Sequence, residues 1–173
     1  RAFDITFADR YSFCIINQSK LEKISNFEFK NLIQRFYNDT YAVDQNACSS
    51  PHLVIWQGKN LSKIRDKFWV KLYDLVKKKY EFSDSAHVEK YADLCKYAAN
   101  LEHIKKIKTY ENLIYRIELN KLDINNHNNR GKQGLFFEHH IKDLNKINHI
   151  INNKYQTLTY FGINKDILKQ FVL

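Results

Sequence analysis

The sequence is poor in the residues that break or bend a chain, and it contains no methionine. Proline occurs once and glycine four times in 173 residues. So few glycines leave no Gly-rich phosphate-binding turn and no nucleophile-elbow pattern, and we therefore expect no nucleotide cofactor. Because the chain begins at Arg1 and lacks methionine, we expect a fragment or processed form in which an N-terminal targeting signal would not be seen.

Cysteine is also scarce. Cys14, Cys48 and Cys95 are an odd number of thiols without a Cys-x-x-Cys pair, so neither a disulfide framework nor a zinc ribbon is indicated, and at most one disulfide could form. Buried free thiols are the expected state. No apolar run approaches the roughly 18 residues of a membrane-spanning helix. The location is unknown. An intracellular one is favoured slightly, and a secreted or host-exposed one stays open.

What the chain does contain is apolar and basic. Apolar residues make up 44% and aromatic residues 14%, enough to form the core of a single domain covering residues 1–173. The net charge of +9 suits nucleic acid, an anionic membrane surface or an acidic protein. Abundant Asn, Lys, Ile and Tyr are also typical of an AT-rich genome, which offers codon bias as another source of the lysines.

Helices are predicted mainly in the middle of the chain. Apolar residues recur every three or four positions over residues 26–43, 61–80, 86–107 and 143–154, and Asn164 is positioned to begin a last helix. In residues 86–107 the apolar stripe contains Val88, Tyr91, Leu94, Cys95, Ala98 and Leu101. The stretch from about 44 to 60 indicates a loop, within which residues 52–56 fit either a strand or a helical turn.

Strands are predicted toward both ends. Residues 3–7 and 13–16 indicate two short strands, and residues 156–161 another. Apolar residues alternate over 113–120 and again over 135–141, which suggests a β-hairpin with a long Asn- and Gly-rich loop. The pattern predicts an α+β fold, in which central helices pack on antiparallel strands from the N-terminal and C-terminal thirds.

The helix at 61–80 has the strongest binding signal. Its Lys63, Lys67, Lys71 and Lys78 are spaced by four, four and seven residues, so they share one face and could follow a row of phosphates. Arg130 and Lys132 in the long loop are further phosphate-binding candidates. Trp56 and Trp69 are candidates for stacking on bases. The alternative is an ordinary solvated face opposite the core, with the aromatic residues inside.

The predicted hairpin holds the candidate catalytic residues. Arg116 lies on one strand, and Glu138 and His140 share one face of the other. Glu138 and His140 would serve as general acid and base on a phosphodiester, with Arg116 stabilising the developing charge and no metal required. His139 and His140 point to opposite faces, so they cannot easily bind one metal ion. The alternative is a structural hairpin with its polar residues outside.

Two functions from different classes fit these features. The first is a basic domain that binds RNA or DNA phosphates, with metal-independent nuclease activity as a further option. The second is a protein-interaction module of a pathogen effector or surface protein, whose partner is an acidic host protein or an anionic membrane surface. A subunit of a larger assembly is a third option. The oligomeric state is not indicated.

Overall fold

Six strands form one mixed sheet in the computed structural model, which describes residues 10–81 and 83–172. They are β1 (Tyr11–Asn17), β2 (Leu53–Gln57), β3 (Ile104–Tyr110), β4 (Ile114–Leu119), β5 (Leu135–Ile141) and β6 (Tyr155–Phe161). Their order across the sheet is β3-β4-β5-β2-β1-β6. Neighbouring strands are parallel, except for the antiparallel pair β3–β4 at one edge.

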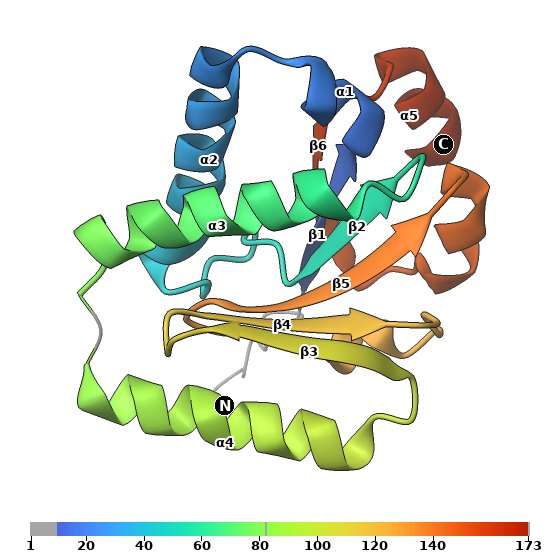
Figure 1. The fold of residues 1–173 in the computed structure, drawn as a ribbon. Coiled ribbons are helices and arrows are strands. Elements are labelled where there is room, and N and C mark those ends of the chain that lie inside the picture. The colour runs from blue at the N-terminus through green and yellow to red at the C-terminus, as the bar shows by residue number, and fades with distance from the viewer. Residues whose placement is uncertain (1–9, 82, 173) are drawn as a thin grey trace, which may run out of the picture.

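Helices cover both faces of this sheet (Figure 1). The α-helices are α1 (Gln18–Lys23), α2 (Asn26–Thr40), α3 (Ser62–Lys79), α4 (Asp84–Asn100) and α5 (Lys165–Val172), and the 3-10 helices are η1 (Tyr41–Val43), η2 (Asn126–Asn128) and η3 (Leu144–Ile150). The core on one face is formed with α2 and α3, and the core on the other face with α4, η3 and α5. No helix in the described ranges is both long and apolar enough to cross a membrane.

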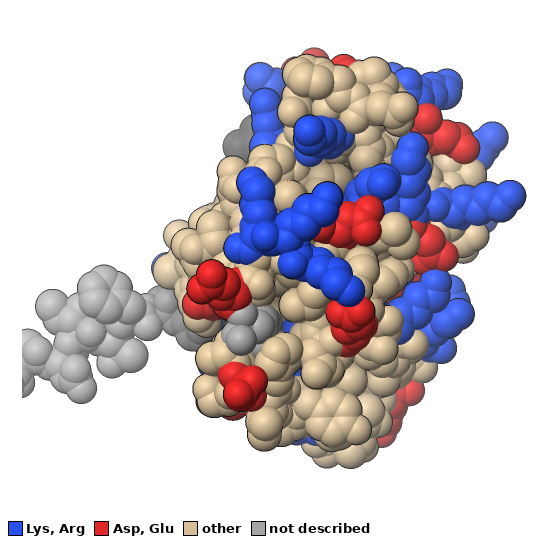
Figure 2. Space-filling model, turned by 60° about the vertical axis from the view of Figure 1, so that its left-hand side comes forward, with Lys and Arg blue, Asp and Glu red and all other residues tan. Residues whose placement is uncertain are grey.

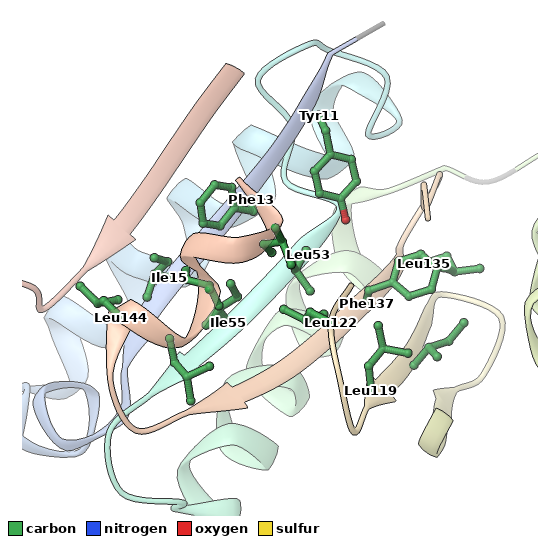
Figure 3. Close-up of a cluster of buried hydrophobic side chains, with 14 of the residues drawn as sticks. Tyr11, Phe13, Ile15, Leu53, Ile55, Leu119, Leu122, Leu135, Phe137 and Leu144 are labelled. Atoms are coloured by element: carbon green, nitrogen blue, oxygen red, sulfur yellow. The ribbon is translucent and has the colours of Figure 1, made fainter. Parts of the chain in front are cut away.

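The two covered faces explain the composition of the central strands. In β1, Phe13 and Ile15 point into one apolar cluster, while Cys14 and Ile16 point into the other. A strand buried on both sides reads as a continuous apolar run instead of an alternation. Figure 3 shows the first of these clusters, in which Phe13 and Ile15 lie near residues of β2, β5 and η3.

The combination of helices with a sheet is confirmed, and so are several elements. The helices predicted at 26–43 and 61–80 are α2 and α3, and the strands predicted at 13–16 and 156–161 are β1 and β6. Residues 52–56 belong mainly to β2. The strand predicted at 3–7 lies outside the described residues. The assignment of a single domain stays a prediction.

The predicted antiparallel pairing of residues 113–120 with residues 135–141 is wrong. Residues 113–120 and 135–141 do form adjacent strands, but β4 and β5 run parallel, with Ile117 opposite Phe137. Parallel neighbours require a crossover connection of about a dozen residues or more, and residues 120–134 provide it. The Asn- and Gly-rich stretch is therefore a crossover and not a hairpin loop.

The antiparallel partner of β4 is β3, whose residues 104–107 fall in the helix predicted at 86–107. Helix α4 ends at Asn100. Its stripe was also misassigned, because Val88 and Tyr91 are 71% and 59% exposed, whereas Lys90 faces the interior at 1%. The helix predicted at 143–154 is the 3-10 helix η3, whose Leu144, Ile147 and Ile150 are buried. Their spacing of three matches three residues per turn.

Candidate functional site

Arg116 and Glu138 form a buried ion pair across the adjacent strands β4 and β5. The Nε atom of Arg116 lies 2.6 Å from Oε1 of Glu138, and its Nη2 atom lies 3.2 Å from Oε2. The two residues are 4% and 1% exposed. Such a bidentate arrangement is the strongest geometry available to an arginine and a carboxylate.

Two tryptophans complete the surroundings of this carboxylate. The indole N–H groups of Trp56 in β2 and Trp69 in α3 donate to Oε2 of Glu138 at 2.6 and 2.9 Å. Both rings are 0% exposed, so neither is available to stack on a base in this conformation. The guanidinium of Arg116 also lies over the Trp69 ring, 5.1 Å from its centre.

Arg116 also contacts a second carboxylate, that of Asp66 in α3, which lies closer to the surface. Nη1 of Arg116 donates to Oδ1 of Asp66 at 3.1 Å, and Nζ of Lys108 in β3 donates to the same carboxylate at 2.8 and 3.0 Å. Burial by itself would raise the pKa of Asp66, but the hydrogen bonds from Lys108 and Arg116 outweigh it and lower that pKa. Five elements, the strands β2, β3, β4 and β5 and the helix α3, are thereby joined by one polar network.

His140 does not join this network. Its Nε2 atom pairs with the carbonyl of Gly58 at 2.8 Å, beyond the end of β2, and no described hydrogen bond links it to Glu138 or Arg116. His139 likewise pairs with the carbonyl of Leu119 at 2.9 Å, and burial lowers its pKa. The structure thus joins two of the three candidate catalytic residues, in a place that a substrate cannot reach without rearrangement. Their catalytic role stays a prediction.

The loop candidates for phosphate binding differ from each other. Arg130 donates from Nη2 to the carbonyl of Arg10 at 2.5 Å and lies 5.8 Å from the centre of the Tyr11 ring. Its side chain therefore ties the crossover to the beginning of β1. Lys132 is exposed.

The lysine row of α3 is exposed, as the spacing predicts. Lys63, Lys67, Lys71 and Lys78 all lie on the surface, and Figure 2 shows Lys and Arg gathered over the upper part of that view, where α2 and α3 lie. Other basic residues are neutralised within the chain, among them Arg65 and Lys105 with Glu118, at 3.4 and 2.7 Å.

A thiol on the surface was not expected. Cys14 is buried, but Cys48 and Cys95 are exposed, so the expectation of buried thiols is wrong for two of three. Cys95 lies on α4. Cys48 lies in the loop that leads from η1 to the beginning of β2, at the edge of the sheet where the parallel strands begin.

Buried polar side chains hold the Cys48 loop in place. The amide of Gln45, 1% exposed, donates to the carbonyls of Pro51 and Leu135 at 3.0 and 3.1 Å, and its oxygen accepts from the N–H of Gly134 at 3.0 Å. Ser12 donates to the carbonyl of Cys48 itself at 2.6 Å. The exposed thiol is therefore carried by a backbone that is fixed from β1 and β5.

The signal for this loop was present in the sequence. Cys48 stands between polar and small residues, Gln45-Asn46-Ala47 and Ser49-Ser50-Pro51, which is a context for a surface loop. The loop was not recognised as the place of an exposed thiol because free cysteines generally tend to be buried.

In the described ranges, no three His, Cys, Asp or Glu side chains are grouped so that they could hold a metal ion.

Comparison with known proteins gives a likeness at the level of the fold. No protein-family model and no curated protein sequence matches the chain. Solved structures do match, and one is betaine aldehyde dehydrogenase from Staphylococcus aureus in complex with NAD+, with a TM-score of 0.54 and 13% identity over 95% of this chain and 35% of that one. Aldehyde dehydrogenase 21 from Physcomitrella patens in complex with the reaction product succinate has a TM-score of 0.55 and 13% identity over 94% of this chain and 36% of that one. An NAD-dependent benzaldehyde dehydrogenase from Corynebacterium glutamicum has a TM-score of 0.51 and 12% identity over 94% of this chain and 36% of that one. The chain spans about a third of the length of these enzymes.

Proposed function

We propose that this chain is the thiol-bearing α/β unit of an enzyme of the aldehyde dehydrogenase type, in which Cys48 forms a covalent adduct with a carbonyl substrate. The observation that carries the proposal is the fold likeness, which extends over 94–95% of the chain in the three enzymes compared. The staphylococcal enzyme has also been solved with a cysteine modified by BME, which makes a reactive thiol a feature to look for here.

Cys48 has two features that such a thiol needs, an exposed side chain and a well-supported backbone. It is exposed, and the backbone of its loop is held by Gln45 and Ser12, so a substrate would meet a thiol carried at a defined place in the chain. Its thiolate would add to the carbonyl carbon and form a C–S bond, while the carbonyl oxygen takes up the electron pair. The described chain has no Gly-rich strand-to-helix turn for a dinucleotide, so the proposal includes no step with NAD.

Acyl transfer from p-nitrophenyl acetate tests the proposal. Attack by Cys48 forms an acyl–sulfur bond, breaks the ester C–O bond and releases p-nitrophenolate, while the thiol proton goes to solvent. We expect a burst of about one equivalent of p-nitrophenolate, because one thiol is acylated in each chain. The burst should vanish in Cys48→Ser and persist in Cys95→Ser, which removes the other exposed thiol. An unchanged burst in Cys48→Ser would refute the proposal.

Nucleic-acid binding by α3, with or without nuclease activity at Glu138 and His140, stays a prediction. A gel-shift assay with a Lys63/Lys67/Lys71→Glu variant tests it, because exposed lysines that follow phosphates give strongly salt-dependent affinity. The protein-interaction alternative also stays a prediction. Recovery of one stoichiometric partner protein, free of nucleic acid, would favour that alternative.

A further inference from the structure

A hollow of about 500 Å³ lies between α2 and α3. Its size falls within the range of about 300–1,000 Å³ that small-molecule sites occupy. The two helices pack against each other along it, and Lys79 of α3 donates to the side chain of Gln34 of α2 at 3.0 Å. Cys48 is not among its lining residues, so a ligand bound in the hollow would be independent of the proposed nucleophile.

The floor of this hollow is apolar. Phe29 and Ile33, one helical turn apart on α2, face Leu75 of α3. Phe29 and Ile33 are only 4% and 3% exposed and belong to the core, whereas Leu75 is partly buried. The floor therefore offers a ligand an apolar surface with a rigid base.

The rim is cationic. Lys30 of α2 and Lys67, Lys71 and Lys78 of α3 line the hollow together with one carboxylate, Asp74, which pairs with Lys71 at 3.3 Å. No described carboxylate forms an ion pair with the other three lysines. Nζ of Lys67 lies 4.8 Å from the centre of the Phe29 ring, so one charge is held directly above the apolar floor.

We infer that this hollow binds a small amphiphilic anion, a phosphate monoester with an aliphatic body. The apolar floor takes the body, and the ammonium groups without a carboxylate partner hold the doubly charged head group as point charges. A polynucleotide would leave the apolar floor largely unused.

Octyl phosphate below its micellar concentration is the probe, measured by isothermal titration calorimetry on the full chain. The test variant is Lys67→Gln/Lys78→Gln. The control, Lys63→Gln/Lys77→Gln, removes the same charge from the same helix outside the hollow. We expect one equivalent of octyl phosphate to bind wild type and control alike, and affinity to fall at least about tenfold in the test variant.

A second experiment on the wild-type protein compares ligands that differ in the length of the alkyl chain. Affinity should rise from butyl to hexyl to octyl phosphate, by up to about fourfold for each fully buried methylene, and inorganic phosphate and octanol should each bind more weakly than octyl phosphate. Equal loss of affinity in both variants, or an affinity independent of chain length, would overturn the inference. So would a single-stranded oligonucleotide that binds through Lys67 and Lys78 while octyl phosphate does not bind.

Discussion

The pair of Arg116 and Glu138 makes the most demanding prediction about stability. Arg116→Met leaves the buried Glu138 carboxylate without a charged partner. Glu138→Gln leaves the buried Arg116 guanidinium with Asp66 as its remaining charged partner, and that side chain is 41% exposed. The side chains of Arg116 and Glu138 are at most 5% exposed and lie 2.6 Å apart, so each single variant should lose about 3–5 kcal/mol of unfolding free energy. That is a large part of the roughly 5–15 kcal/mol that typically holds a domain together.

The double variant Arg116→Met/Glu138→Gln should be far less damaging than the two losses added together. Both indole N–H groups donate to the same oxygen, Oε2 of Glu138, and the single carbonyl oxygen of a glutamine can accept both of them. No buried charge then remains unpaired. We expect a coupling free energy of at least about 2 kcal/mol between the two sites.

Urea unfolding followed by tryptophan fluorescence and circular dichroism measures these free energies. The matched control is Lys77→Met/Glu111→Gln, which removes an exposed ion pair of comparable length, 2.9 Å, and should leave the unfolding midpoint nearly unchanged. If the losses of the two single variants simply add in the double variant, or if each single loss is below about 1 kcal/mol, then the pair is not the buried, coupled unit described.

Three further predictions concern buried groups and one tight turn. Burial lowers the pKa of Lys90 to about 7, and an unfolded lysine keeps about 10.4, so between these values the unfolded chain binds the extra proton. Stability in urea should therefore rise with pH from about 7 to about 8.5, by up to roughly 1.4 kcal/mol per unit, and this rise should disappear in Lys90→Met. Above about 8.5, ionisation of the Cys14 thiol in the unfolded chain opposes the rise. Burial raises the pKa of the Cys14 thiol to about 12. Iodoacetamide should therefore label Cys48 and Cys95 in the native protein, and Cys14 only after unfolding. Fast labelling of Cys14 in the native protein would contradict its burial. Gly134 has a φ of 92°, and an added Cβ would lie 2.4 Å from the backbone oxygen of Leu113. Gly134→Ala should therefore clearly lower the urea midpoint of unfolding. An unchanged midpoint would show that the turn relaxes easily.

Apolar periodicity predicted the helices that have one solvent-exposed face. It missed elements whose apolar spacing is typical of a different secondary structure. Helix α3 was predictable because its core stripe and its lysines occupy opposite faces. Strand β3 was missed because Ile104 and Ile107 are three residues apart and three lysines surround them, as in an exposed helix. Lysines on an edge strand instead discourage pairing with further strands.

The apolar pattern of the sequence could not predict the relative direction of the strands or the burial of the Arg116–Glu138 pair. The alternation in β4 and β5 is the same whether they pair parallel or antiparallel, and only the crossover through residues 120–134 decides it. The sequence did place Arg116 and Glu138 on neighbouring strands. It did not show that Trp56 and Trp69 would close over the carboxylate, because helix α3 reaches that position only through the packing of its face on the sheet.

The site of acylation tests the central claim most directly. After incubation with p-nitrophenyl acetate, tandem mass spectrometry of peptides from the native protein locates the acyl group. The account predicts a single modified residue, Cys48, with Cys95 much less modified although it is also exposed. Acylation spread equally over Cys48, Cys95 and surface lysines would contradict it, because Cys48 would then be an ordinary exposed thiol.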